Sequence, residues 1–237
     1  MIKTLEEGFK YLKLPYSKDI ENKFILYRDL LKEWNQKINI TSIEEDEEIY
    51  IKHFIDSVLL LNEDNFDESK KIIDVGTGGG FPGLPLKIIN VNYKLTLLDS
   101  LKKRIDFLSE TTKALNLQDV KLIHGRAEDF GQNKEHRENY DICVSRAVAP
   151  LNVLSEYCIP FVKVGGYFAA YKSDNISREI ADSDNAIKKL GGKIKEVKEI
   201  CLPGTDIVRK IVIIEKNRPT DSKYPRKAGK PSKEPLK

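Results

Sequence analysis

The sequence has few of the features that mark membrane-spanning, secreted or metal-binding proteins. No apolar run approaches the roughly 20 residues that a membrane-spanning helix needs, and the opening MIKTLEEGF carries acidic residues where a signal peptide has its apolar segment. The three cysteines, Cys143, Cys158 and Cys201, are an odd number without CxxC spacing, which argues against a disulfide framework or a zinc site. We therefore expect a cytoplasmic protein without a membrane segment or a bound metal.

The chain also lacks a strong net charge, since its 237 residues sum to only +3. That total conceals an uneven distribution: residues 1–70 hold 10 basic and 16 acidic side chains, and residues 216–237 hold 8 basic and 2 acidic ones. The C-terminal residues are rich in proline, glycine and serine and poor in apolar side chains, so they cannot fold alone. They are either a frayed terminus that aids solubility or a basic arm for nucleic-acid phosphates.

The first 68 residues show the periodicity of amphipathic helices. Ser17 is placed to cap one helix at its N-terminus, and Thr41 with Glu44 matches a capping box before a later helix. Apolar side chains recur at helical spacing at Ile20, Phe24, Tyr27, Leu31 and Trp34.

From residue 71 onward, short β-branched runs alternate with helical stretches. The runs KIIDV, KLTLLD, VKLIH, YDICVS and GGYFAAY predict strands, and a Pro203-Gly204 link predicts a hairpin between two further strands. This alternation is typical of parallel βαβ units. We predict an α/β fold with a doubly wound, mostly parallel seven-stranded sheet that ends in an antiparallel hairpin. The expected divisions are a helical region (1–68), a sheet domain (69–216) and a basic C-terminal arm (217–237).

The segment DVGTGGGFPGLPL, residues 74–86, directly follows the first predicted strand. Its glycines permit a tight turn and let a ligand approach the backbone closely. A GxGxxG pattern runs through Gly78, Gly80 and Gly83, and by itself it would suggest an NAD-dependent oxidoreductase.

Two neighbouring features favour S-adenosyl-L-methionine over NAD as the ligand of this turn. The Asp74 carboxylate is placed to face the cationic amino group of an amino-acid-like ligand, and it would repel a pyrophosphate. Pro82 and Pro85 fall where a pyrophosphate-binding helix begins, and they lack the amides that a phosphate needs. S-adenosyl-L-methionine is therefore the preferred cofactor.

The next two strands end in further candidate cofactor contacts. Asp99, 25 residues after Asp74, is placed to accept both ribose hydroxyls, or else to cap the helix that follows. Ala127 and Glu128 of GRAEDF are placed to contact the adenine edge, or else form a surface turn. Because parallel strands end at one edge of a sheet, these residues are expected to lie together.

The fourth strand ends in SRAVAPL, at the position where such sheets often carry catalytic residues. An NPPY loop for exocyclic amines and a Pro-Cys nucleophile for ring carbons are both absent, and Cys143 is expected to be a small core residue. Arg146 is expected to contact a guanine edge, an RNA phosphate or the cofactor, or else to form a structural salt bridge or pair with Asp141. Guanine N7 has a lone pair and no proton to lose, so its methylation requires only placement and no general base.

Seven motifs spread along nearly the whole chain resemble the RsmG (GidB) family of 16S ribosomal RNA guanine-N7 methyltransferases. The glycine-rich turn alone implies only a class I methyltransferase, whereas its combination with SRAVAPL and the YPRKAG tail is specific to the family. The motifs are WNQKINITSI, HFIDSVLL, DVGTGGGFPGLPL, LLDSLKKRIDFL, GRAEDF, SRAVAPL and YPRKAGKPSKEPL.

The resemblance implies a class I, Rossmann-like enzyme that transfers a methyl group from S-adenosyl-L-methionine to N7 of one guanosine in 16S rRNA. The implied partner is 16S rRNA or the small-subunit ribosomal particle, and we expect a monomer. An NAD-dependent oxidoreductase and a non-enzymatic ribosome-assembly factor are the alternatives. By motif position, the implied cofactor contacts are Gly76, Phe81, Asp99, Ala127, Glu128 and Arg146, in addition to Asp74 and Gly78 of the glycine-rich turn.

The resemblance also assigns roles outside the cofactor pocket. Arg146 is expected to position the reactants, and His53 is expected to be a buried, hydrogen-bonded histidine. Phe81 is an apolar wall of the pocket or simply a core aromatic. The basic arm gains an RNA-binding role, with Arg226, Lys227, Lys230 and Lys233 as the expected contacts. Trp34, Asn35, Asn39 and Thr41 are expected to brace the helices against the sheet.

Overall fold

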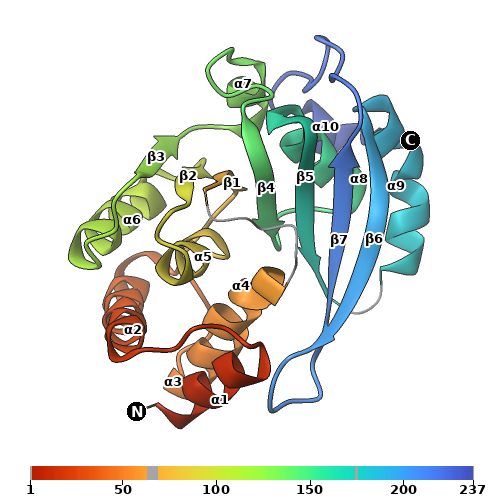
Figure 1. Ribbon diagram of the computed structural model, residues 1–237. Helices are drawn as coiled ribbons and strands as arrows, with labels where there is room; N and C mark the ends of the chain where they lie inside the picture. The colour runs from red at the N-terminus through yellow and green to blue at the C-terminus, as the bar shows by residue number, and fades with distance from the viewer. Residues whose placement is uncertain (1, 63–68, 174–175, 237) are drawn as a thin grey trace.

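The computed structural model describes residues 2–62, 69–173 and 176–236 (Figure 1). Within these residues seven strands form one sheet in the order β3-β2-β1-β4-β5-β7-β6. The strands are β1 (Lys71–Val75), β2 (Lys94–Asp99), β3 (Val120–His124), β4 (Tyr140–Arg146), β5 (Val162–Lys172), β6 (Gly192–Cys201) and β7 (Val208–Lys216).

The sheet is parallel through its first five positions and antiparallel at its end. β1 pairs in parallel with β2 and β4, and β4 pairs in parallel with β5. β7 is antiparallel to both β5 and β6, so the hairpin predicted around Pro203-Gly204 is confirmed. The predicted doubly wound sheet is confirmed as well. The C-terminal ends of β1, β2 and β4 therefore meet at one edge.

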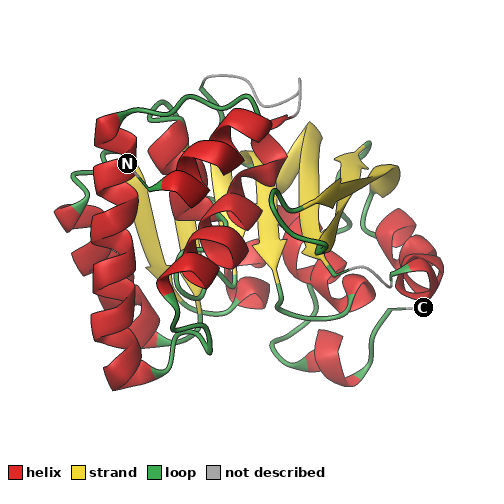
Figure 2. Ribbon diagram, turned by 90° about the horizontal axis from the view of Figure 1, so that it is seen from below, coloured by secondary structure: helices red, strands yellow, loops and turns green. Residues whose placement is uncertain are grey.

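Helices cover both faces of this sheet (Figure 2). One group precedes the sheet in the chain, and the others connect the strands. The first group is α1 (Lys3–Tyr11), α2 (Lys18–Ile38), α3 (Asp46–Ile49), the π-helix η1 (Tyr50–Ile55), α4 (Asp56–Val58) and the 3-10 helix η2 (Leu59–Asn62). The others are α5 (Gly83–Ile89), α6 (Lys102–Ala114), α7 (Ala127–Gln132), α8 (Leu151–Cys158), η3 (Ile159–Phe161), α9 (Ser177–Lys189) and α10 (Lys230–Lys233).

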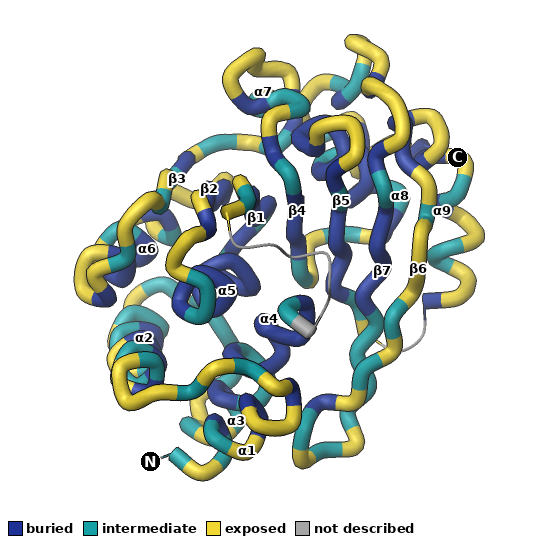
Figure 3. The backbone as a smooth tube through the Cα atoms, viewed as in Figure 1, coloured by how far each residue is buried: buried dark blue, intermediate teal, exposed yellow. Residues whose placement is uncertain are grey.

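Alternation along the strands divides the apolar residues between two cores, one on each face of the sheet. In β4, for example, Ile142 and Val144 belong to one core and Cys143 to the other, so Cys143 is the predicted core residue. The same split separates Ile213 from Ile214 in β7. Figure 3 shows this central burial along β4, β5 and β7, with exposed residues on the outer helices.

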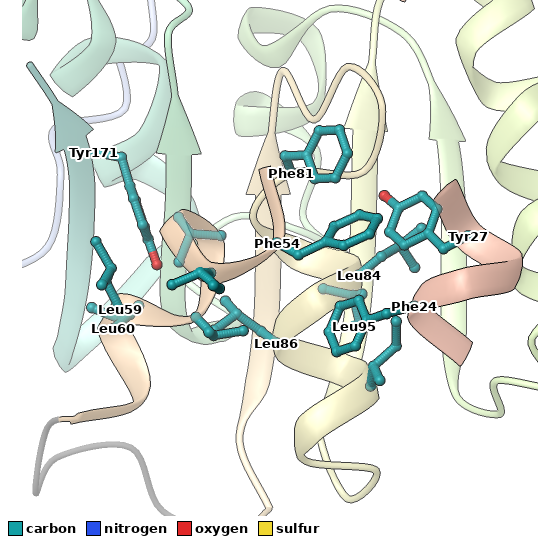
Figure 4. Packing of buried hydrophobic residues seen from close by; sticks show 14 of the residues in the cluster. Phe24, Tyr27, Phe54, Leu59, Leu60, Phe81, Leu84, Leu86, Leu95 and Tyr171 are labelled. Atoms are coloured by element: carbon teal, nitrogen blue, oxygen red, sulfur yellow. The ribbon is translucent and has the colours of Figure 1, made fainter. Parts of the chain in front are cut away.

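The N-terminal helices share one core with α5, α6 and one face of the sheet. Tyr27 of α2 stacks on Phe54 of η1 with ring centroids 5.0 Å apart, and on Phe81 at 5.5 Å (Figure 4). The Tyr27 hydroxyl donates to the Gly79 carbonyl. The helical periodicity read from the sequence therefore corresponds to a face that packs against the glycine-rich turn.

The caps of the N-terminal helices confirm one prediction and overturn another. Ser17 caps α2 by accepting a hydrogen bond from Ile20 N at 3.2 Å, as predicted. The capping box at Thr41 is wrong, because α3 begins after Glu45 and has no side-chain cap. The Thr41 hydroxyl instead accepts from Ile43 N at 3.0 Å and lies 2.7 Å from His53 Nε2.

The end of α2 is expected to brace the helices against the sheet, but the contacts of its side chains are with helix α6 and the local backbone. Trp34 packs against Phe107 of α6 with ring centroids 5.9 Å apart. Asn35 Oδ1 accepts from the amides of Ile40 and Thr41 at 2.7 and 2.8 Å, which closes the C-terminus of the helix. Asn39 is the C-cap and adopts a left-handed conformation with φ +50°.

Candidate active site

The glycine-rich loop, residues 76–82, connects β1 to α5 at the C-terminal edge of the sheet. Gly76 has φ +71°, and a Cβ there would lie 2.6 Å from Cγ2 of Val148. Gly80 has φ +95°, and a Cβ there would lie 2.5 Å from the Tyr27 hydroxyl oxygen. Only glycine satisfies both the backbone conformation and the space at these two positions.

Asp74 holds this loop in place from inside the protein. It is fully buried, and its Oδ2 accepts from the Thr77 hydroxyl at 2.7 Å and from Gly83 N at 2.8 Å. Oδ1 has no hydrogen-bond partner among the described residues. Burial raises the pKa of this carboxyl to about 7. A contact to a ligand's amino group, as predicted from the sequence, stays a prediction, and Oδ1 is the atom available for it.

The start of α5 offers no cradle for a pyrophosphate. The Gly83 amide donates to Asp74 and the Leu84 amide to the Gly80 carbonyl at 2.8 Å. Pro82 is the N-cap residue and Pro85 lies in the first turn, and neither has an amide proton. The amides that would bind a dinucleotide phosphate are therefore already used or absent.

Two cavities border the glycine-rich loop. The smaller cavity has a volume of about 150 Å³, and the buried Asp99 is one of the acids that line it. Asp99 Oδ2 accepts from Gly78 N at 2.9 Å, and Oδ1 accepts from Leu101 N at 2.9 Å. The alternative role of Asp99 as a helix cap is wrong, because Leu101 is the N-cap residue of α6. Asp99 instead joins the glycine-rich loop to the end of β2.

Ala127 and Glu128 line the same smaller cavity at the start of α7. Glu128 is only 6% exposed, which rules out the alternative of a surface turn. Glu128 Oε1 accepts from Gly229 N at 2.8 Å, and Oε2 accepts no hydrogen bond from any described residue. The predicted cofactor residues Gly76, Asp99, Ala127 and Glu128 are thus brought together.

The larger of the two cavities has a volume of about 580 Å³. Gly76, Gly78 and Phe81 line it, together with the ends of β4, β5 and β7 and the η1 helix. Basic side chains outnumber acidic ones in its lining. The basic residues are Lys52, Arg104, Arg146, Lys172 and Arg209, and the acidic ones are Asp56 and Glu179.

Arg146 belongs to an ion-pair network in the larger cavity. Its Nη1 lies 2.7 Å from Asp56 Oδ2, and Arg209 Nε lies 2.9 Å from Asp56 Oδ1. Its guanidinium also lies over the Phe81 ring, 5.1 Å from the centroid. The alternative of a structural salt bridge is confirmed, with Asp56 as the partner, whereas the alternative pair with Asp141 is wrong, since Asp141 pairs with Lys163. Asp141 and Arg146 lie five residues apart along β4, which is about 16 Å in a strand.

His53 packs flat against Phe81 with ring centroids 4.5 Å apart. The Arg146 guanidinium can only donate, so His53 Nδ1, 3.3 Å from Nη2, is the acceptor, and Nε2 carries the proton toward Thr41. Burial and the Arg146 charge lower the histidine pKa to about 3. The predicted hydrogen bonding of His53 is confirmed, but the residue is half-buried, and its ring lines the larger cavity, which the sequence pattern did not predict.

The C-terminal segment, residues 220–236, packs on α7 and α8, which overturns the alternative of a frayed terminus. Arg226 forms a two-pronged pair with Glu156, through Nε to Oε1 at 2.8 Å and Nη2 to Oε2 at 2.6 Å. Glu156 has no exposed surface. This pair corrects the RNA contact predicted for Arg226. Lys227, Lys230 and Lys233, the other predicted RNA contacts, are exposed.

Three residues of the site lack a local sequence signal. Asp56 lies within an apolar helical run, and Arg209 lies in the last strand, 153 positions later. Gly229 contacts Glu128 across 101 positions. Sequence spacing cannot show such pairs, because the tertiary fold brings them together.

Neither a membrane-spanning helix nor a metal site is found in the described part of the chain. None of its helices is long and apolar enough to cross a membrane. Among residues 2–62, 69–173 and 176–236, no three His, Cys, Asp or Glu side chains gather as metal ligands would.

Solved structures with a similar fold include other methyltransferases. A chain of a complex between the Haloferax volcanii Trm112 methyltransferase activator and a methyltransferase matches with a TM-score of 0.60 and 13% identity, over 79% of this chain and 98% of that one. Precorrin-6y C5,15-methyltransferase from Geobacter metallireducens GS-15 matches with a TM-score of 0.51 and 11% identity, over 68% and 87%. At these identities the likeness shows the fold alone.

Comparison of sequences gives a much closer match. Ribosomal RNA small subunit methyltransferase G of Alkaliphilus metalliredigens is 51% identical over 233 residues, which is 98% of each chain. The protein of the same name from Clostridium perfringens strain 13 is 54% identical over 224 residues, 94% of each. The family model described as rRNA small subunit methyltransferase G matches residues 20–208. The chain therefore belongs to the GidB family of rRNA small subunit methyltransferases G.

Proposed function

We propose that the protein transfers a methyl group from S-adenosyl-L-methionine to N7 of a guanosine in 16S rRNA. Family membership supports the reaction class and the RNA. The observation in the structure that carries the proposal is that two cavities share Gly76 of the glycine-rich loop, the smaller with buried carboxylates in its lining and the larger with five cations and two acids. The first environment suits ribose hydroxyls and an ammonium group, and the second suits RNA.

The residues at the loop fit the cofactor. Asp99 and Glu128 offer carboxylates to the ribose and the adenine, and Ala127 lines the same cavity. The buried Oδ1 of Asp74 and the free Oε2 of Glu128 are acceptors without partners among the described residues. When bound, S-adenosyl-L-methionine supplies an electrophilic methyl group on a sulfonium centre. Gly76 and Gly78 leave the loop backbone open to close approach, and Phe81 forms an apolar wall.

The larger cavity is where the guanosine would bind. Arg209 and Lys172 lie in its wall, where they pair with Asp56 and Glu179. The Arg146 guanidinium is fixed by Asp56 and covers Phe81, so it orients the wall between the two cavities and acts as a positioning residue.

A general base is not required for this reaction, because N7 of guanine has a lone pair and no proton to remove. The protonation of His53 agrees with this requirement: with a pKa of about 3 its ring is neutral at physiological pH. Both of its ring nitrogens are engaged, with Thr41 and Arg146. His53 therefore shapes the pocket and does not shuttle protons.

Lys227, Lys230 and Lys233 form an exposed basic surface that we assign to 16S rRNA or the small-subunit particle. Each phosphate neutralised there releases counterions, so RNA binding should weaken with salt. The protein would act as a cytoplasmic monomer.

The test is mass spectrometry of digested 16S rRNA from cells with and without the gene. The expected result is the loss of one N7-methylguanosine, restored by the wild-type protein and not by Gly76→Arg. If the RNA is unchanged on deletion, the proposed reaction is wrong. Restoration by Gly76→Arg would instead favour a non-enzymatic assembly factor. Calorimetry that detected NAD binding but no S-adenosyl-L-methionine binding would favour an oxidoreductase.

A further inference from the structure

The C-terminal segment contacts the lining of the smaller cavity at Glu128. Glu128 is 6% exposed and lines that cavity with Ala127 and Asp99. Among the described residues, the only hydrogen bond to its carboxylate comes from Gly229 N, at 2.8 Å to Oε1. The orientation of the Glu128 carboxylate therefore depends on a residue 101 positions away.

Gly229 is itself fixed by the residues around it. It adopts φ +80°, and its carbonyl accepts from Lys233 N at 3.3 Å as the N-cap of α10. Three residues earlier, Arg226 is bound to the buried Glu156 of α8 through both its backbone amide and its guanidinium. Next to Glu156 in α8 is Tyr157, which lines the smaller cavity.

Further contacts anchor the rest of the segment on the other side of Glu128. Arg137 donates to the carbonyls of Thr220 and Tyr224, each at 2.6 Å. Gln132 of α7 donates to the Pro225 carbonyl at 2.9 Å. A Cβ at Gly131 would lie 2.8 Å from Pro225 Cγ, so segment and helix are in direct contact. The helix that begins with Ala127 and Glu128 is thus held along its length by the C-terminal segment.

We propose that the C-terminal segment is part of the cofactor site, and that Gly229 and Arg226 are positioning residues for Glu128. The inference rests on the proposed function for the identity of the ligand. Gly229 aims its amide at Oε1 and leaves Oε2 for a ligand hydroxyl or amine. Through its pair with Glu156, Arg226 fixes how closely the segment packs against α8. Since the two contacts lie within four residues, displacement of the segment would release Glu128 and weaken ligand binding.

Substitution of Gly229 tests this directly. A Cβ there would meet nothing within 4 Å, so Gly229→Val perturbs only the backbone, which β-branched residues do not hold at positive φ. Gly204→Val is the matched control, because Gly204 has φ +76° and equally open space in the β6–β7 hairpin. Gly229→Asn is the rescue variant, because asparagine tolerates the left-handed region and keeps the amide.

The probe is S-adenosylhomocysteine, measured by isothermal titration calorimetry on the full-length chain. Gly229→Val is expected to bind it about tenfold more weakly than wild type, while Gly204→Val and Gly229→Asn bind it within about twofold of wild type. Equal binding by Gly229→Val, or an equal loss in Gly204→Val, would overturn the inference. No binding by the wild-type protein would instead count against the proposed function.

Hydrogen exchange of the wild-type protein provides a second measurement that does not depend on any variant. Because coupling between a ligand and a segment is reciprocal, S-adenosylhomocysteine should slow amide exchange in residues 226–233. The same ligand should leave residues 202–206 of the β6–β7 hairpin unchanged. Unchanged exchange in residues 226–233 with ligand bound would contradict the proposal.

Discussion

The two cavities beside the glycine-rich loop differ in charge and in the part of the chain that completes them. Among the charged side chains that line the larger cavity, cations outnumber acids by five to two, and the N-terminal helices contribute Lys52, His53 and Asp56 to the lining. The smaller cavity has buried acids, Asp99 and Glu128, and the C-terminal segment contacts the second of them. The glycine-rich loop therefore borders both cavities, whereas the N-terminal helices complete the larger cavity and the C-terminal segment completes the smaller one.

Both sides also depend on a buried carboxylate that arginine neutralises. Asp56 has one arginine on each oxygen, and Glu156 has both oxygens bound by Arg226. Removing one partner of such a buried pair is costly because the other charge stays desolvated. These two pairs explain why segments at opposite ends of the chain pack tightly against one domain.

The largest expected effect comes from breaking the loop that separates the cavities. Gly76→Val forces a side chain into φ +71° and against Val148, where a Cβ would already be only 2.6 Å from Cγ2. We expect S-adenosylhomocysteine affinity to fall more than 100-fold, a loss of about 2.7 kcal/mol or more. Isothermal titration calorimetry measures it. Gly165→Val is the control, because Gly165 has φ +84° with open space in β5. If Gly76→Val bound S-adenosylhomocysteine as tightly as wild type, the proposed cofactor site at Gly76 would be wrong.

The second effect tests the ion-pair network of the larger cavity. Asp56→Asn leaves Arg146 and Arg209 without their carboxylate, and Asp56 is 3% exposed as a side chain. We expect the free energy of unfolding to fall by about 3 kcal/mol, as for other buried pairs that lose one partner. Urea unfolding checks the change. Asp46→Asn serves as the control: Asp46 is 47% exposed and pairs with Arg28, so its loss should cost under about 1 kcal/mol. Equal costs would mean the network contributes little.

The smallest expected effect is a change of ligand affinity with pH, which tests whether Asp74 contacts the ligand. Its pKa of about 7 in the folded protein lies above the ordinary value of 3.8, so the folded state holds the proton more tightly than the unfolded state. This stabilisation is complete below pH 3.8 and is lost as the pH rises through 7. A cationic amino group binds the ionised carboxylate more tightly. Ligand affinity should therefore rise with pH, while this contribution to stability falls.

We therefore expect wild-type protein to bind S-adenosylhomocysteine about tenfold more tightly at pH 8 than at pH 6, because the ionised fraction of Asp74 increases by that factor. Asp74→Asn should show a flat profile over this range. Calorimetry at both pH values measures the difference. An equal pH dependence in wild type and variant would show that Asp74 does not contact the amino group.

Much of the fold followed from local patterns. KIIDV, KLTLLD and VKLIH are strands with the bounds that the sequence predicted, because β-branched runs between helical stretches leave few other conformations. The Thr41 capping box failed since Thr41 has a stronger use, beside His53 and the Ile43 amide. The pairing of Arg146 with Asp141 failed because strand geometry separates them.

The sequence by itself determined the strands and the glycine-rich loop, because these depend on residues close together in the chain, and it determined the family through seven motifs along the chain. Only the tertiary structure decided the partners of Arg146, Arg226 and Glu128, which lie 70 to 101 positions away from them. That the C-terminal residues cannot fold alone stays a prediction from composition. Their packing depends on two carboxylates outside the segment, Glu156 in α8 and Glu128 in α7. No pattern within the segment itself could predict these two partners.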